Sequence, residues 1–337
     1  MTPSAAPVAL DPLLAGMRET LDARALGPPG AYRRFPAPDA AGEAPDPYGC
    51  ADAVNLLYTL GALDAAATDR AGWIATLQGL QDPETGLFRE GTHHPIHTTA
   101  HCIAALELLD AKPRHPLAAL APLRDPGAVA PFLEGLAWRT DPWSASHQGA
   151  GLYAALVLAG EVDAAWQARY FDWLDRESDP ATGMWRAGAI DPSPTGAHSL
   201  FPYLAGTFHY LFNLESARHP LRHPAALVDT CLTVYHDAVY PLARFVSFAE
   251  VDWVYCLNRA LKQSGHREAE GRAALRAFAA RFVAFLHGVD RARDDGWNDL
   301  HRLFGAACAL AELQSALPDE LTSATPLRLV LDRRPFI

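Results

Sequence analysis

The chain has 337 residues, of which 50% are hydrophobic and 20% are charged, enough to bury one large core or two ordinary domains. Its formal net charge of −11 argues against nucleic acid or an anionic membrane as a partner, because both require a basic surface. No run reaches the roughly 18 apolar residues that a transmembrane segment needs, and no secretory leader is visible. The five cysteines form no Cys-x-x-Cys pair, which is typical of a reducing compartment. We therefore expect a cytoplasmic protein with a small-molecule substrate, and no oligomeric state is predicted.

Helical periodicity dominates the sequence from the N-terminus onward, and the alternating Val, Ile and Thr pattern of strands is absent. The pattern predicts twelve helices in six pairs. One member of each pair is amphipathic, as shown by the stripe of Trp166, Tyr170, Trp173 and Leu174, and is expected on the outside. These outer helices are predicted at 10–21, 64–81, 128–138, 161–177, 224–236 and 267–288.

The other member of each pair is apolar on most faces and is expected to be buried all round. These inner helices are predicted at 51–61, 98–109, 149–160, 199–214, 252–261 and 300–313. Two concentric layers could form an open solenoid, but a closed ring leaves no exposed terminal face. The sequence thus predicts an all-α, (α/α)6 toroid as a single domain over 1–337. Residues 22–49 would form a Pro/Gly-rich loop or lid over the ring, and 316–337 an extended C-terminal tail.

A polar residue recurs near the start of each predicted inner helix, at intervals of 45, 50, 51, 54 and 47 residues. If the ring closes, these side chains meet at one end of its centre. Carboxylates and imidazoles exchange protons near neutral pH once burial shifts their pKa values, so we expect acid/base catalysis there. The alternative role is capping of helix N-termini. The catalytic candidates are Asp52, His97, His147, His198, Asp252 and Asp299, together with Glu250.

Glu250 and Asp252 stand two residues apart and would not share a helix face, so we expect one to point inward and the other to cap the helix. His97 and His101 lie four residues apart on one face, a spacing that suits metal ligands, but a third ligand would have to come from elsewhere. No metal and no cofactor is therefore predicted. His209 lies in an aromatic helix and is interpreted as a core histidine.

Several aromatic and cationic residues could bind the substrate in the ring. Aromatic faces could stabilise a carbocation or stack on sugar rings, although core packing would also explain them. Two arginines occupy matching positions after similar turns and could hold an anionic group. The substrate-binding candidates are Trp143, Trp185, Trp253, Trp297, Tyr203, His101, His301, Arg89 and Arg186.

Two turns share a sequence motif, Gln81-Asp-Pro-Glu-Thr-Gly-Leu-Phe88 and Ser178-Asp-Pro-Ala-Thr-Gly-Met-Trp185. Asp-Pro followed by Gly is turn chemistry, and its role is predicted to be structural. With the following His97-Thr-Thr-Ala-His101 helix, the motif resembles the repeats of terpenoid cyclases and protein prenyltransferase β subunits over residues 50–313. The resemblance implies the toroid and an apolar substrate in its centre. The Asp-x-Asp-Asp acid of the cyclases and the Asp-x-Cys zinc ligands of the transferases are both absent.

Three functions remain open. The first is an enzyme of terpenoid cyclase or prenyltransferase type that uses carboxylate and histidine acid/base chemistry on an apolar or amphipathic substrate. The second is a carbohydrate-active hydrolase, lyase or epimerase, since similar rings also act on sugars. The third is a non-catalytic scaffold. A dry aromatic cavity would favour the first, an open polar one the second, and a filled centre the third.

Overall fold

The computed structural model describes residues 7–36, 44–191, 200–236 and 242–337. The predicted all-α class is confirmed. Among these residues the strands are limited to β1 (Val8–Ala9) and β2 (Leu321–Thr322), which pair in parallel and tie the start of the chain to its end. In the described part of the chain, no helix is long and apolar enough to cross a membrane.

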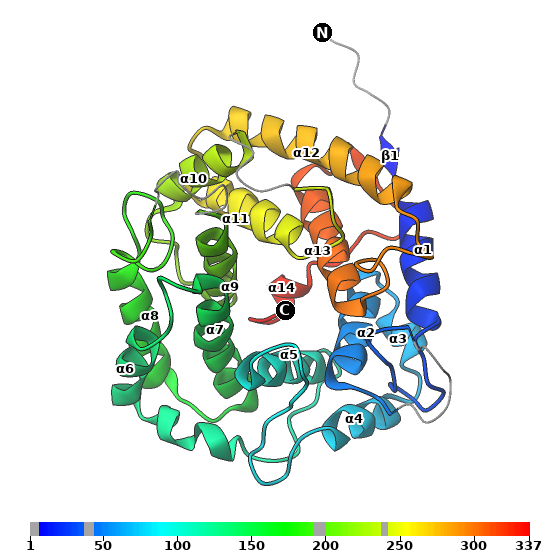
Figure 1. Cartoon of the computed structure of the whole chain (residues 1–337), viewed down its shortest axis with the longest axis horizontal. Helices are drawn as coiled ribbons and strands as arrows, with labels where there is room; N and C mark the ends of the chain where they lie inside the picture. The colour runs from blue at the N-terminus through cyan, green and yellow to red at the C-terminus, as the bar shows by residue number, and fades with distance from the viewer. Residues whose placement is uncertain (1–6, 37–43, 192–199, 237–241) are drawn as a thin grey trace.

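Six long helices surround the centre of the molecule (Figure 1). Each packs against the next, and the last packs against the first, so that they enclose a central space. We call them the inner helices. They are buried on nearly all faces, as their apolar sequences predict. The inner helices are α2 (Pro47–Thr59), α5 (Pro95–Leu108), α7 (Pro142–Ala159), α9 (Phe201–Ala217), α11 (Ala249–Ser264) and α13 (Leu300–Ala316).

Apart from α14, the remaining helices precede or separate the inner ones along the chain and lie outside them (Figure 1). The stripe predicted on α8 is confirmed, because Trp166, Tyr170, Trp173 and Leu174 are all buried. The outer layer is built by α1 (Asp11–Asp22), α3 (Leu63–Ala66), α4 (Arg70–Gly79), η1 (Ala118–Arg124), η2 (Pro126–Ala128), α6 (Val129–Glu134), α8 (Ala164–Glu177), α10 (Pro224–His236) and α12 (Glu268–Gly288).

The single outer helix predicted at 64–81 is wrong. Asp69 accepts a hydrogen bond from the Gly72 amide and starts a new helix, so the segment forms α3 and α4. The helix predicted at 128–138 is also shorter than expected, since α6 ends at Glu134 and short 3-10 turns precede it.

Four inner helices, α2, α5, α7 and α11, begin earlier than the sequence pattern predicted, and this moves their recurring polar residues inside them. Asp46, His94 and Asp141 are the N-caps of α2, α5 and α7, each followed by a proline at the first helical position. Asp52 therefore lies in the second turn of α2 and does not cap it. Only Asp299, of the described members of the recurring set, is an N-cap, accepting from the His301 amide.

The shared turn motif is structural. The Gln81 side chain donates to the carbonyl oxygens of Gly86 and His115 and accepts from the His115 amide, each at 2.8 Å. Gly86 and Gly183 have φ values of 74° and 73°, which favour glycine. The Gln81 side chain therefore ties the turn after α4 to the loop that follows α5.

The C-terminal segment runs under the ring and turns into its centre (Figure 1). It is extended only in part, because α14 (Val330–Arg333) forms a helical turn. Beyond it, Arg334 is buried and donates to Asn55, and the Pro335 carbonyl accepts from Asn213 at 2.8 Å. The Phe336 ring packs against the rings of inner-helix residues. This segment closes one end of the central space.

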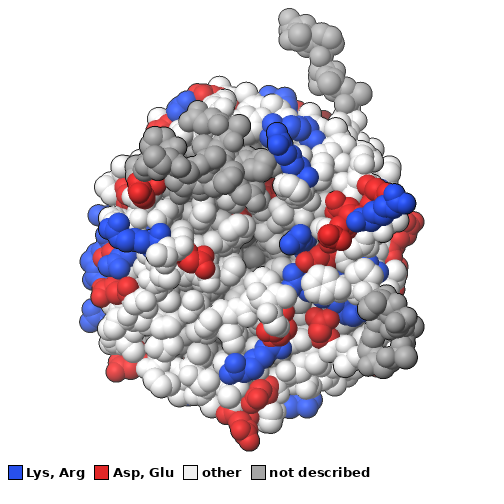
Figure 2. All heavy atoms as spheres, in the orientation of Figure 1, with Lys and Arg blue, Asp and Glu red and all other residues white. Residues whose placement is uncertain are grey.

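Acidic and basic side chains are scattered over the face drawn in Figure 2, and neither sign forms a continuous patch there.

Candidate functional site

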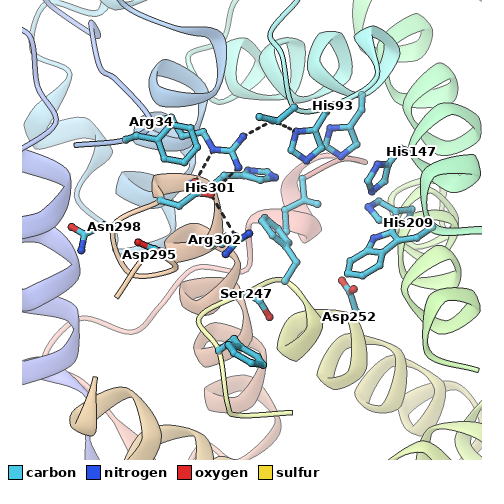
Figure 3. Close-up of a pocket in the computed structure, with 18 of the residues that line it drawn as sticks. Arg34, His93, His147, His209, Ser247, Asp252, Asp295, Asn298, His301 and Arg302 are labelled. Atoms are coloured by element: carbon cyan, nitrogen blue, oxygen red, sulfur yellow. Dashed lines mark hydrogen bonds and ion pairs between the residues drawn. The ribbon is translucent and has the colours of Figure 1, made fainter. Parts of the chain in front are cut away.

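A cavity of about 770 Å³ occupies the centre of the ring (Figure 3). Its volume is in the range of small-molecule sites. Most of its described lining residues are polar. The lining comes from all the inner helices except α2, from the loops that precede α2, α5, α11 and α13, and from the C-terminal residue. The lining residues are Arg34, Phe35, Pro36, Thr92, His93, His97, Trp143, His147, His209, Phe245, Ser247, Phe248, Asp252, Asp295, Asn298, Asp299, His301, Arg302 and Ile337.

One wall of the cavity is supported by a buried carboxylate. Asp52 Oδ1 accepts from His101 Nε2 at 2.8 Å and from His301 Nδ1 at 3.0 Å. Burial alone would raise the pKa of Asp52, but His301 and His101 outweigh burial and hold this pKa below its usual range. Burial lowers the pKa of His301 to about 4, although Asp52 opposes that effect. At neutral pH, His301 is thus a neutral ring with Nδ1–H on Asp52 and its Nε2 lone pair free.

A second cluster joins three inner helices. His97 of α5, His147 of α7 and His209 of α9 each bring one ring nitrogen within 4.8 Å of the others. Burial, and next the neighbouring histidines, lower the pKa values of His97 and His147 well below the usual range, and burial lowers that of His209 to about 3. The three rings are therefore neutral at pH 7. Phe336 packs against His97 and His209, with ring centroids 5.0 and 6.5 Å apart.

The sequence grouped His97 with His101, and the structure separates them. Their ring centroids are 6.5 Å apart, and each ring joins a different cluster. His97 instead lies with His147 and His209. From the sequence, His209 is interpreted as a core histidine. It is buried, but it also lines the cavity.

Glu250 and Asp252 take different roles. Asp252 of α11 lines the cavity, and neither of its carboxyl oxygens has a hydrogen-bond partner within the described residues. Burial, with the nearby Glu250, raises its pKa well above the usual range. Glu250 does not reach the cavity and is not the N-cap of α11. It accepts from the Ala243 amide at 3.0 Å and from Ser247 Oγ at 2.6 Å, so it holds the loop before α11.

Asp299 combines capping with an ion pair at the cavity wall. Arg34 Nε and Nη2 donate to its two oxygens at 2.7 and 2.8 Å, and both side chains are buried. This bidentate pair anchors the segment before α2 against α13. Arg302 lies 3.6 Å from Asp299 as well. The described part of the segment predicted as a lid therefore reaches the cavity at Arg34 and the two residues after it.

The structure brings only one of the five predicted aromatic residues, Trp143, to the cavity. The other four are buried between helices. Trp185 Nε1 donates to Leu174, Trp253 Nε1 to Cys231, Trp297 Nε1 to Thr20 and Tyr203 Oη to Ala189, each at 2.7–2.9 Å.

The matching arginines do not line the cavity. Arg89 is exposed, and Arg186 forms an ion pair with Glu177. His198, the remaining candidate, lies outside the described residues.

Sequence reasoning missed Arg34, His93 and three aromatic residues of the lining, Phe35, Phe245 and Phe248. His93 stacks on the rings of Tyr48 and His97, with centroids 4.7 and 4.8 Å apart. A local signal for His93 was present. His94-Pro95 marks the start of α5, so His93 lies just before this inner helix. No local signal reveals Arg34, because its partner Asp299 is 265 residues away in sequence.

Comparison with protein-family models, with curated proteins and with solved structures finds no match for this chain.

Proposed function

We propose that the protein is an enzyme whose active site is the central cavity of an (α/α)6 toroid, with His301 as general base and Asp52 as its positioning residue. Its substrate is a small hydroxylated molecule of the carbohydrate class. Support for the toroid comes from the strict alternation of inner and outer helices along the chain and from the contact of α13 with α2.

The observation that carries the proposal is the hydrogen bond from His301 Nδ1 to Asp52 at 3.0 Å. An imidazole fixed by a buried carboxylate has one tautomer and one orientation, and its conjugate acid is stabilised when it accepts a proton. Because His301 lines the cavity, the free Nε2 is available to a bound hydroxyl or C–H group. Asp252, which burial keeps protonated, lines the same cavity and can supply a proton.

The polar lining favours a hydroxylated substrate over an isoprenoid. Asp252 and the cluster histidines offer donors and acceptors that an apolar chain would leave unpaired, at a cost in binding. Phe35 and Phe245, which are 48% and 61% exposed, lie at the same cavity and provide flat faces for sugar rings. An apolar substrate, as the resemblance to terpenoid cyclases implies, has less support.

Two substrate panels test the proposal. Purified protein is incubated with hexose- and uronate-containing oligosaccharides and with isoprenoid diphosphates, and products are measured by mass spectrometry. We expect turnover in the sugar panel, and a fall in kcat of about 10²–10⁴-fold in His301→Gln, the range for loss of a general base. His219→Gln is the matched control, because His219 pairs with Asp175 on the outer layer.

Turnover of isoprenoids alone would contradict the substrate class. An unchanged kcat in His301→Gln would show that His301 is not the general base. If no panel member is bound or converted by the wild-type protein, the scaffold interpretation gains support.

A further inference from the structure

We infer that His97, His147 and His209 form a binding site for one divalent transition-metal ion, with an open position facing the cavity. The inference goes beyond the proposed function and does not depend on it, since it concerns the second cluster and is tested by metal binding. Three imidazole nitrogens with a remaining open position are the donor set of many catalytic zinc sites.

The geometry suits a tetrahedral ion after small ring rotations. One nitrogen of each ring lies within 4.8 Å of the others, and the ring centroids of His147 are 4.4 Å from His97 and 4.8 Å from His209. Zinc–nitrogen bonds of about 2.0–2.1 Å place the nitrogens of a tetrahedral site about 3.3 Å apart. The rings come from three neighbouring inner helices, so the scaffold fixes their directions.

The hydrogen bonds behind the rings leave the facing nitrogens free. His209 Nδ1 lies 2.9 Å from the Ala205 carbonyl oxygen, which can only accept, so Nδ1 carries the proton and Nε2 the lone pair. The Nδ1 atom of His97 lies 2.5 Å from Tyr48 Oη, the kind of outer partner that orients a metal-bound histidine. His147 has no hydrogen bond within the described residues. When Tyr48 Oη accepts from His97 Nδ1, each of the three rings can offer one nitrogen lone pair to a cation.

A carboxyl group that could lose its proton to such a cation lies on the same cavity. Both oxygens of Asp252 are buried without a partner in the described residues, and Figure 3 places this carboxyl on the side of His147 and His209. An unpartnered buried carboxyl is costly, and a nearby dication would compensate it. Imidazoles together with oxygen donors suit zinc and its neighbours in the first transition row.

The other cluster does not need an ion. Asp52 already accepts two imidazole hydrogen bonds at 2.8 and 3.0 Å, which place protons where a metal would stand. Asp52 and His101 are fully buried beneath the cavity wall. Hydrogen bonds therefore link the three residues of this cluster through Asp52 Oδ1, while Asp52 Oδ2 and His101 Nδ1 have no partner among the described residues. No hydrogen bond links the rings of His97, His147 and His209 in the described structure.

Metal binding to the full chain tests the inference. The protein is stripped with a chelator and titrated with Zn²⁺ against a competing chelating dye, and bound metal is measured by mass spectrometry. We expect one Zn²⁺ per chain. His147→Ala and His209→Gln should weaken binding by more than roughly 100-fold, the upper range for loss of an outer partner alone. Co²⁺ should give the visible absorption of tetrahedral nitrogen and oxygen coordination without a thiolate band.

His93→Ala is the matched control, since His93 stacks beside His97 but its nitrogen bonds to Glu90 and Thr92. It should keep the wild-type stoichiometry and affinity. His147→Ala removes a half-buried ring without a hydrogen bond, so its circular dichroism and metal-free unfolding should match those of the wild type. Absence of stoichiometric binding, wild-type affinity in both cluster variants, or loss of binding in Asp52→Asn with His147→Ala unaffected would each overturn the inference.

Discussion

The buried carboxyl of Glu250 should make the protein less stable as pH rises. Burial raises its pKa from 4.5 to about 7, although Ser247 and the Ala243 amide oppose that effect. Between these two values the folded protein keeps a proton that the unfolded chain has lost, so the free energy of unfolding falls as pH rises. Each pKa unit corresponds to about 1.4 kcal/mol, so the group removes about 3 kcal/mol of stability by about pH 8.

Replacing Glu250 by glutamine removes this titration and preserves the shape of the side chain. The amide oxygen can still accept from Ala243, and the amide nitrogen can donate to Ser247 Oγ. Urea unfolding at several pH values should give similar stabilities for both proteins near about pH 4, with the Glu250→Gln variant ahead by about 3 kcal/mol near about pH 8. The other titrating groups are common to both proteins and largely cancel. A difference between the two proteins that does not change with pH would refute the reasoning.

Three further stability predictions each concern a single residue. Asp299→Ala removes both the α13 cap and the ion pair with Arg34, and should lower the free energy of unfolding in urea by about 3 kcal/mol; a loss below about 1 kcal/mol would contradict this. Gln81→Ala should cost about 2–3 kcal/mol in the same assay, because three hydrogen bonds of 2.8 Å are lost; an unchanged midpoint would show that the turn holds without it. Gly86→Ala should lower Tm more than Gly160→Ala, because both have positive φ values but only at Gly86 does a new Cβ meet a backbone carbonyl oxygen, that of Pro116; equal Tm values would be inconsistent with that overlap.

The helical class was predictable because periodicity is local. The apolar inner sequences and the amphipathic stripe of α8 assigned each helix to its layer, and the recurrence of polar residues indicated where the inner helices meet. Helix boundaries were less accurate. The sequence does contain start signals for α2 and α7, at Asp46-Pro47 and Asp141-Pro142. The predicted starts followed the regularly spaced polar residues instead, and were therefore placed too late.

The site was predicted in part. His97, His147, Asp252 and His301 do line the cavity, since residues near the start of an inner helix point to its centre. The predicted aromatic residues other than Trp143 instead fill the space between layers. An aromatic side chain fits the same sequence pattern at the cavity wall and between the helix layers. Only the direction of its Cα–Cβ bond decides which of these two places it occupies.

The sequence by itself determined the helices, their division into two layers and the gathering of histidines and carboxylates near the inner-helix starts. The tertiary structure alone decided the partners. Asp52 meets His301 across 249 residues, and Arg34 meets Asp299 across 265. His97 lies with His147 and His209, whereas His101, four residues along the same helix, lies with Asp52 and His301. Local propensity depends on residues a few positions apart, whereas proton positions and metal ligands depend on atoms a few ångströms apart, and ring closure brings those atoms together.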